Sequence, residues 1–268
     1  MTTYLERLPK HEKLFIPFIM SGDPTPELTI KLALLLEEAG ASVLELGVPY
    51  SDPLADGPVI QRASKRALAH KTTITSTMEL AGEMRRRGLK IPIILFTYYN
   101  PVLQLGEESF FALAKQNQVD GLLVPDLPFE ESGRIREKCS EHAITYISLV
   151  APTSKERMNT ITEHAQGFLY CISSLGVTGV RKEFSEELYA FLNEVKKKSN
   201  VPTAVGFGIS ESEHIQTLKP YCDGFVVGSA LINMIEQKEK QFKVDEEKTL
   251  HELKQQIEEL ISPLLAER

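Results

Sequence analysis

The sequence predicts an α/β fold, and three observations narrow that class to one barrel. Short apolar runs rich in β-forming residues alternate with segments of helical spacing, which is typical of parallel βαβ units. Eight such units fill about 230 residues, close to the usual size of a (β/α)8 barrel. No linker rich in Pro, Gly or Ser divides the chain. We therefore expect one domain over residues 1–268, a single (β/α)8 TIM barrel with an N-terminal capping helix and extra helices.

Each element follows from its local pattern. The segment Pro26–Ala39 carries an apolar stripe on one helical face, with Thr25 as its N-cap and Gly40 as its stop. A short helix over Thr2–Lys13 caps the barrel, and the apolar stripe from Leu250 to Leu264 docks the C-terminus against it. The expected strands are Phe15–Met20, Val43–Val48, Ile91–Tyr98, Gly121–Val124, Ile144–Leu149, Gly167–Ile172, Val201–Phe207 and Gly224–Val227.

An open doubly wound sheet is the competing architecture. It typically uses fewer strands and marks a dinucleotide site with a G-x-G-x-x-G motif. The nearest match begins at Gly206 and lacks the third glycine. The highly charged stretch Glu236–Lys248 is typical of a solvated helix face or loop. The barrel therefore remains the preferred fold.

Composition excludes several classes of protein. The 268 residues carry 30 Lys and Arg against 37 Asp and Glu, a net charge of −7, so neither nucleic acid nor an anionic membrane is the expected partner. No apolar run approaches the roughly 18 residues of a spanning helix, and no signal peptide opens the chain, which predicts a cytoplasmic protein. The three cysteines form no C-x-x-C pair and are expected in the core. The histidines show no ligand spacing, so no metal is expected.

The second expected strand carries the first candidate for chemistry, Glu45. A period of two places Val43, Glu45 and Gly47 on one face and branched apolar residues on the other. The apolar face suits the helices outside the barrel, which directs Glu45 into the barrel mouth. Desolvation there raises the pKa of a carboxyl toward values useful for proton transfer. The alternative is a structural ion pair.

The loop after this strand adds a second carboxylate, Asp56. Two carboxylates in different surroundings can divide acid and anion roles, and Asp56 is expected to stay ionised because the next helix starts at Pro58. Asp56 could instead be a helix cap. Tyr170 on the sixth strand either points its phenol into the mouth or packs in the core.

Glycine-rich loops after the last two strands predict a phosphate site. Gly206 and Gly208 follow the seventh strand, and Gly228 with Ser229 follows the eighth just before a helix. Barrels often bind phosphate with these loops, because bare backbone N–H groups and a helix N-terminus converge there. Taken singly, either glycine pair could be only a turn. The loop Ser173–Arg181 has the length and glycine hinges of a lid, or is a surface loop.

These motifs resemble those of the tryptophan synthase alpha subunit family. The resemblance is carried by Leu44–Pro58, by Pro17-Phe18 with Gly22-Asp23-Pro24, and by Tyr98–Pro101, Val124–Pro128, Gly176–Gly179, Gly206–Ser210 and Gly228–Ala230, in order over nearly the whole chain. It implies a lyase that cleaves indole-3-glycerol phosphate to indole and D-glyceraldehyde 3-phosphate in tryptophan biosynthesis. One departure is Ser174, where many members carry Arg. The resemblance is therefore weakest for lid gating and for the coupling of the lid to a partner.

The resemblance also implies a role for each matching residue. Glu45 matches the acid–base group, Asp56 the carboxylate that faces the indole N–H, and Tyr170 an auxiliary group at the reacting carbon. The remaining matches are the phosphate cradle (Gly179, Gly208, Gly228 and Ser229), the walls of the indole slot (Phe18 and Tyr98), and Thr178 of the lid, which meets Asp56 on closure.

Family members act with a separate beta subunit, which implies an alpha2-beta2 heterotetramer. This chain is expected to hold no cofactor, since pyridoxal phosphate belongs to the beta subunit. The matching partner contacts are Asp52, Pro53, Asn100 and Pro128. The sequence leaves three alternatives: a free-standing lyase that releases indole, another phosphate-binding barrel enzyme such as an isomerase, and a non-catalytic barrel that scaffolds a partner.

Overall fold

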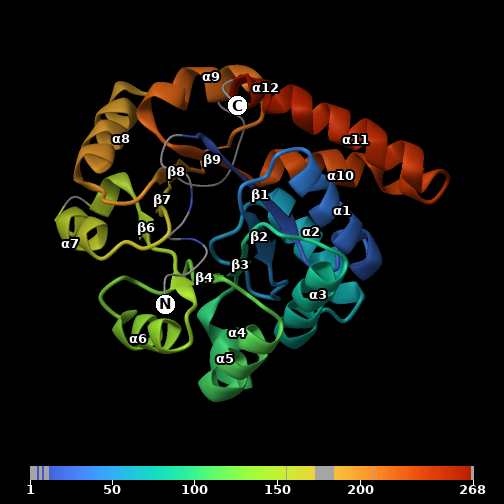
Figure 1. Ribbon diagram of the computed structural model, residues 1–268, viewed down its shortest axis with the longest axis horizontal. Coiled ribbons are helices and arrows are strands. Elements are labelled where there is room, and N and C mark those ends of the chain that lie inside the picture. The colour runs from blue at the N-terminus through green and yellow to red at the C-terminus, as the bar shows by residue number, and fades with distance from the viewer. Residues whose placement is uncertain are drawn as a thin grey trace.

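The computed structural model describes residues 5, 8, 12–154, 156–172, 184–206 and 208–266. Within them a parallel sheet is surrounded by helices (Figure 1). The strands are β1 (Leu14–Met20), β2 (Leu44–Gly47), β3 (Ile93–Phe96), β4 (Gly121–Leu123), β5 (Thr145–Tyr146), β6 (Leu149–Val150), β7 (Leu169–Cys171), β8 (Thr203–Val205) and β9 (Gly224–Val227). They confirm the predicted α/β barrel.

The sheet closes through the fifth expected strand, which the structure divides into β5 and β6. The strand order runs β5-β4-β3-β2-β1-β9-β8-β7-β6, so these two short strands end the sheet. Only Ile147 and Ser148 separate them, and the hydrogen-bond ladder continues across: Ile147 N donates to Leu122 O at 2.9 Å and Tyr170 N to Ser148 O at 3.0 Å. One continuous segment therefore pairs with β4 on one side and β7 on the other.

Helices follow the strands and cover the outside of the barrel. They are α1 (Pro26–Glu38), α2 (Pro58–Ala69), α3 (Ile74–Arg86), α4 (Tyr99–Leu105), α5 (Glu107–Gln116), α6 (Gly133–Glu141), α7 (Met158–Glu163), α8 (Glu186–Lys198), α9 (Ser212–Leu218), α10 (Ser229–Phe242), α11 (Glu246–Leu260) and α12 (Ser262–Leu265). Short 3-10 turns span Pro152–Ser154 and Lys219–Tyr221. The Thr25 side chain caps α1 by accepting from Leu28 N at 3.1 Å, as expected. Most of the expected capping helix Thr2–Lys13 lies outside the described residues.

The alternation of side chains in the strands separates two apolar clusters. Leu14, Ile16 and Val43 join an interior cluster inside the barrel, whereas Phe15, Ile19 and Leu44 pack with the helices outside it. The three cysteines are buried and free, which confirms the core prediction. The C-terminal helices also dock as expected, because their apolar stripe joins the outer cluster.

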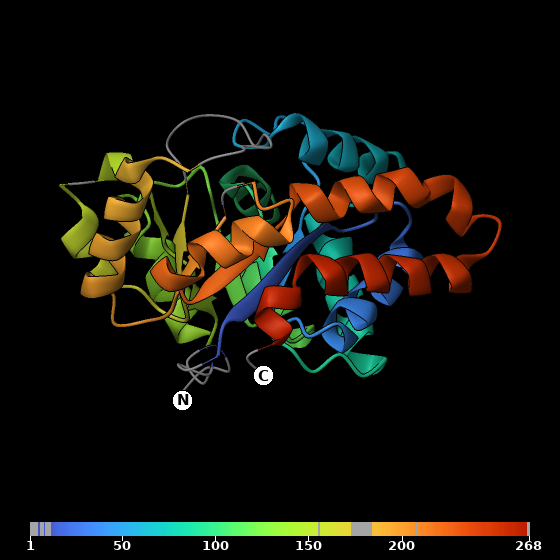
Figure 2. The ribbon, with the colours of Figure 1, turned by 90° about the horizontal axis from the view of Figure 1, so that it is seen from above.

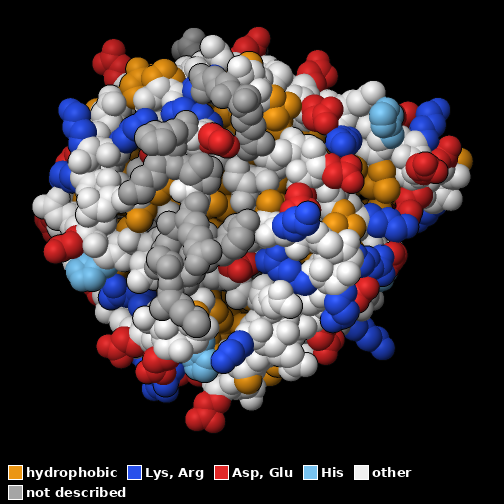
Figure 3. Space-filling view, in the orientation of Figure 1, with side chains coloured by type: hydrophobic (Ala, Val, Ile, Leu, Met, Phe, Trp, Pro, Cys, Tyr) orange, Lys and Arg blue, Asp and Glu red, His pale blue; other side chains and the backbone are white. Residues whose placement is uncertain are grey.

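The charged stretch Glu236–Lys248 is more than a solvated face. Glu236 on α10 pairs with two arginines of α2, and Lys238 is buried and pairs with Glu252 of α11 at 3.0 Å. Helix α10 lies beside α2, and α11 lies below α10 in Figure 2. Elsewhere, acidic and basic side chains are interspersed over the face shown in Figure 3.

Candidate active site

Glu45 lies on the interior face of β2, as the alternation predicts. It pairs in register with Phe18 of β1 on one side and Ile94 of β3 on the other. Ile94 belongs to the interior cluster, and so does Val43, which lies two residues before Glu45. The carboxyl group therefore enters the barrel near the carboxyl ends of the strands, where barrel enzymes bind substrate.

Burial dominates the electrostatics of Glu45. Its exposed fraction is 0%, and neither carboxyl oxygen has a hydrogen-bond partner among the described residues. Desolvation raises the pKa of Glu45 to about 8. No salt bridge to Glu45 exists within the described part of the chain, which leaves the ion-pair alternative without support there. At neutral pH the group is mostly protonated and can donate a proton.

Asp56 is held at the mouth by Tyr98, which follows β3. The Tyr98 hydroxyl accepts a hydrogen bond from Ala55 N at 2.9 Å and is also hydrogen-bonded to the Asp56 carboxylate. Burial raises the pKa of Asp56 to about 6, and the Tyr98 hydrogen bond offsets part of the rise. Burial and the Asp56 charge in turn raise the pKa of Tyr98.

Asp56 is expected to stay ionised, and its raised pKa of about 6 agrees with that expectation at neutral pH. Helix α2 begins at Pro58 as predicted. Its N-cap is Gly57, so Asp56 does not have the alternative role of a helix cap. Desolvation of the carboxylate is the largest cause of its raised pKa. With a pKa of about 6, Asp56 is still mostly ionised at neutral pH.

Tyr170 points into the mouth instead of only packing. It contacts the interior cluster and stays partly exposed. Burial raises the pKa of its phenol well above the usual value, and the charges of Glu45 and Asp56 raise it further, so both carboxylates lie near this ring. A Cβ on Gly206 would lie 2.5 Å from the Tyr170 hydroxyl oxygen, so only glycine leaves room for it. The structure thus gathers Glu45, Asp56 and Tyr170.

An aromatic wall borders the carboxylates. The Phe18 ring packs edge-on against Phe96 with centroids 5.4 Å apart. A Cβ on Gly47 would lie 2.5 Å from Phe18 Cζ, so this glycine admits the ring. Tyr50 lies against Tyr98 at 5.2 Å. Phe96 and Tyr50 were not among the predicted site residues; the period of two in β3 could have identified Phe96.

The glycine loops lie at the ends of β8 and β9, where the phosphate site is predicted. Gly208 has a φ of +57°, which glycine adopts without strain. Helix α10 begins at Ser229 with Gly228 as N-cap, and no side chain of the described residues caps it. Gly208, Gly228 and Ser229 are all partly exposed. Open backbone N–H groups at this helix start suit an anion. The lid residue Thr178, the cradle residue Gly179 and the departure at Ser174 lie outside the described residues.

The four predicted partner contacts lie along one rim of the mouth. Asp52, Asn100 and Pro128 are exposed and Pro53 is partly exposed. Two hydrogen bonds link their segments: Asn100 Nδ2 donates to Tyr50 Oη at 3.0 Å, and Tyr99 N donates to Asp126 Oδ1 at 3.0 Å. Two apolar side chains also project from these segments, since Leu54 is 93% exposed and Leu103 is 51% exposed.

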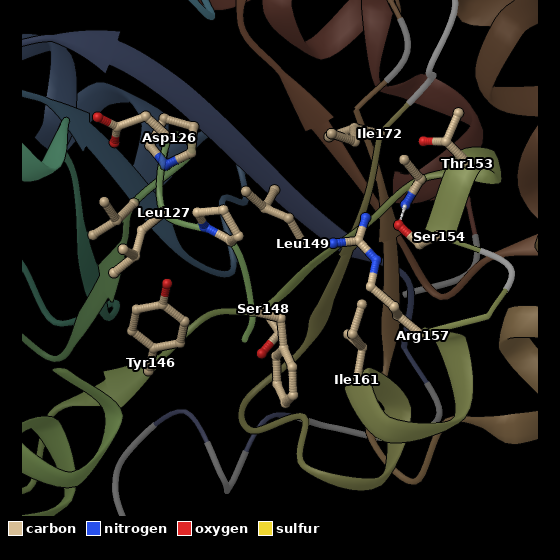
Figure 4. Close-up of a pocket in the computed structure, with 15 residues that line it drawn as sticks. Asp126, Leu127, Tyr146, Ser148, Leu149, Thr153, Ser154, Arg157, Ile161 and Ile172 are labelled. Atoms are coloured by element: carbon tan, nitrogen blue, oxygen red, sulfur yellow. Dashed lines mark hydrogen bonds between the residues drawn. The ribbon is translucent and has the colours of Figure 1, made fainter. Parts of the chain in front are cut away.

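A separate hollow of about 300 Å³ adjoins the mouth between the loops after β4 and β6 (Figure 4). Leu149 and Ile172 border it, and the Arg157 guanidinium extends toward its centre. Ser148 Oγ is buried there without a hydrogen-bond partner among the described residues. Pro128 lines this hollow, but Glu45, Asp56 and Tyr170 do not, so it adjoins the candidate site without containing its chemistry.

Two further features concern cofactors and membranes. The described residues bring together no group of three His, Cys, Asp or Glu side chains that could hold a metal ion. Among the helices of the described ranges, none has the length and apolar character needed to cross a membrane.

Comparisons with known proteins agree with this geometry. A family model described as tryptophan synthase alpha chain matches residues 5–262. The chain is 61% identical over 253 residues to the tryptophan synthase alpha chain of Geobacillus sp. (strain WCH70), covering 94% of this chain and 96% of that one. The corresponding protein of Bacillus subtilis (strain 168) is 63% identical over 226 residues, 84% of this chain and 85% of that one.

Solved structures give the same result. The tryptophan synthase a2b2 complex from Pyrococcus furiosus contains a chain that matches with a TM-score of 0.83 and 38% identity, over 93% of this chain and 98% of that one. The Legionella pneumophila alpha subunit matches with a TM-score of 0.83 and 38% identity, over 94% and 93%. The chain therefore belongs to the tryptophan synthase alpha chain family.

Proposed function

We propose that this chain cleaves indole-3-glycerol phosphate with Glu45 as the acid–base group and Asp56 as the anion beside the indole N–H. Membership of the family makes the chain a carbon–carbon lyase of tryptophan biosynthesis. The observation that carries the assignment of residues is the pair of carboxyl groups at the mouth, whose pKa values are raised to about 8 and about 6. At a pH between these two values, Glu45 is a protonated acid and Asp56 is an anion.

The chemistry needs one group of each kind. A carbon–carbon bond to indole C3 breaks readily only after C3 is protonated, which leaves positive charge on the ring. Protonated Glu45 supplies the proton, and ionised Asp56 accepts the indole N–H hydrogen bond and stabilises the charge. The Glu45 carboxylate then removes the proton of the adjacent glycerol hydroxyl, while the bonding electrons return to the ring. Indole leaves, and glyceraldehyde 3-phosphate forms.

The rest of the mouth binds and orients the substrate. Phe18 and Tyr98 form walls that fit a flat indole ring, and Tyr170 lies beside the reacting carbon as an auxiliary group. The backbone N–H groups at Gly208, Gly228 and Ser229 bind the phosphate by donating hydrogen bonds to its oxygens. The N-terminus of α10 adds positive potential. By resemblance, Gly179 completes the cradle and Thr178 closes over Asp56.

A beta subunit is the proposed partner. The tryptophan synthase of Pyrococcus furiosus is an a2b2 complex that shows mutual activation. In this chain the rim with Asp52, Pro53, Asn100 and Pro128 is exposed and carries the apolar side chain of Leu54, which supports docking there. We infer an alpha2-beta2 heterotetramer in the cytoplasm, in which this chain is one domain without a cofactor and pyridoxal phosphate belongs to the beta subunit.

Indole release by the purified chain tests the proposal. We expect release from indole-3-glycerol phosphate by the chain alone and a clear increase when a beta subunit is added, because the Pyrococcus furiosus complex shows mutual activation. Strong turnover alone with no increase on mixing would favour a free-standing lyase. No indole under either condition would favour a scaffold or another barrel enzyme, and the proposed function would be wrong.

A further inference from the structure

A network of charges joins three elements above the substrate site. Arg66 of α2 forms a two-pronged pair with Asp23 of the loop after β1, with Nε to Oδ1 at 2.6 Å and Nη2 to Oδ2 at 2.8 Å. Its third nitrogen, Nη1, donates to Glu236 Oε1 of α10 at 2.5 Å. Arg62, one turn earlier on α2, donates to Glu236 Oε2 at 2.7 Å. Glu236 thus receives both arginines and ties α2 to α10.

Helix α2 also packs directly on the substrate site. Its residues Ile60, Ala63 and Ala67 form one apolar cluster with Phe18, the proposed indole wall, and with Ile232 of α10. The two helices lie side by side in Figure 2. A helix clamped in this way cannot shift without moving the wall beneath it.

The two helices begin in different halves of the site. Helix α2 starts at Pro58, two residues after Asp56, and its Ser64 hydroxyl binds both the N–H and the carbonyl of Tyr50 at 2.9 and 3.0 Å. It therefore holds the loop that carries the proposed indole anion. Helix α10 starts at Ser229 of the proposed phosphate cradle. The α2–α10 contact consequently joins the indole half of the site to the phosphate half.

We propose that Glu236 and Arg66 are positioning residues, which set the spacing between the indole half and the phosphate half by clamping α2 to α10. The inference rests on the proposed function, because it concerns a substrate that spans both halves. Neither residue needs to touch the substrate. A small shift between two rigid halves leaves each half intact but weakens the binding of any ligand that must contact both halves at once.

Glu236 is the better residue to change. The Asp23 side chain is fully buried, so removing Arg66 would leave a buried carboxylate without its partner and could unfold the protein. The Glu236 side chain is 26% exposed, and Glu236→Gln leaves the Asp23–Arg66 pair in place. The substitution removes the charge that attracts Arg62 and Arg66 to α10.

A matched control exists on α3. Glu83 also pairs with two arginines, Arg86 at 2.6 Å and Arg87 at 2.9 Å, and its side chain is 31% exposed. These partners lie on α3 itself or directly after it, away from α2 and α10. Glu83→Gln therefore removes an equivalent charged bridge without affecting the α2–α10 contact.

Three probes measure the effect on the wild type and both variants: indole alone, inorganic phosphate alone, and a non-cleavable analogue with indole joined to phosphate through a saturated three-carbon chain. For Glu236→Gln we expect each half-ligand to bind within about twofold of wild type and the spanning analogue to bind about tenfold more weakly. KM for the substrate should rise by about the same factor while kcat falls less. Glu83→Gln should match the wild type throughout.

The outcomes separate this inference from the proposed function. If the spanning analogue binds Glu236→Gln as tightly as it binds wild type, or loses no more affinity than the half-ligands do, the positioning role is overturned. If the wild type itself fails to bind the analogue, the proposed function fails instead. Thermal unfolding checks that the variant is folded; if it is not, Arg62→Gln, which removes a more exposed α2 partner of Glu236, is measured with the same probes.

Discussion

The two halves of the mouth handle charge in opposite ways. The indole half uses side chains: Glu45 and Asp56 are carboxyl groups whose pKa values rise because burial removes water. The proposed phosphate half uses backbone, with glycines at 206, 208 and 228 and the start of α10. In the proposed function, burial thus creates a reactive proton on one side, and open N–H groups receive an anion on the other.

The difference explains how a chain with a net charge of −7 can bind an anionic substrate. Long-range attraction is unfavourable, so we propose that recognition comes from local dipoles at the α10 N-terminus. It also predicts different consequences of substitution. Changes in the indole half should reduce the rate of the chemical step, and changes in the phosphate half should weaken binding.

The largest effect is expected for Glu45→Gln. The amide cannot donate a proton to the indole carbon, so indole release should fall by about 10²-fold or more while substrate binding changes little. A steady-state assay of kcat and KM checks this. Full activity of the variant would exclude Glu45 as the acid–base group and would favour a non-catalytic or different role.

Stability provides the control for the same variant. Because folding raises the pKa of Glu45 from 4.5 to about 8, its contribution to stability is present at low pH and is lost as the pH rises to about 8. Glu45→Gln removes this dependence, so the variant should lose less stability than wild type between pH 5 and about 8. Chemical denaturation across this range measures it.

The pH profile of kcat/KM should be bell-shaped. In the proposed mechanism activity needs protonated Glu45 and ionised Asp56, so it should fall below about pH 6 and above about pH 8. Asp56→Asn should lower activity by about tenfold or more and abolish the acid limb. A phosphate monoester also titrates near pH 6. An acid limb that survives in Asp56→Asn would therefore belong to the substrate.

A binding defect is expected for Gly228→Ala. The added Cβ would lie 3.6 Å from its nearest neighbour, Phe18 Cβ, and the φ of −109° suits alanine. Stability should stay within about 0.5 kcal/mol of wild type. KM should rise about tenfold with a smaller change in kcat, because the methyl group occupies space that the phosphate needs. Gly133→Ala, at the start of α6 with open space around it, is the control; equal KM values for both variants would contradict the phosphate site.

The smallest effect is expected for Tyr170→Phe. The ring still fills the space over Gly206, and only the hydroxyl near the two carboxyl groups is lost. We expect kcat to fall by no more than about fivefold, consistent with an auxiliary role. A loss as large as that of Glu45→Gln would show that the phenol, not the glutamate, transfers the proton.

The fold was largely predictable because its information is local. Short apolar runs located the strands, and Thr25 with Pro26 located the start of α1. The split of the fifth strand was not predictable, since it depends on how β4 and β7 pair with one continuous segment. The structure also shortened most strands, usually at both ends, because ladder pairing covers only the central residues of each apolar run.

The residues of the site show the same division. Strand alternation and barrel topology predicted that Glu45 points into the mouth, and the following loop suggested Asp56. Phe18 and Tyr98 were expected there only from the family resemblance. Only the tertiary structure decided the electrostatics of the site. Burial raises the pKa of Asp56 and its hydrogen bond to Tyr98 offsets part of the rise, and Glu236 bridges two helices although its charged neighbours resemble a solvated face. Desolvation and ion pairing depend on atoms brought together from distant segments, so the folded chain alone determines them.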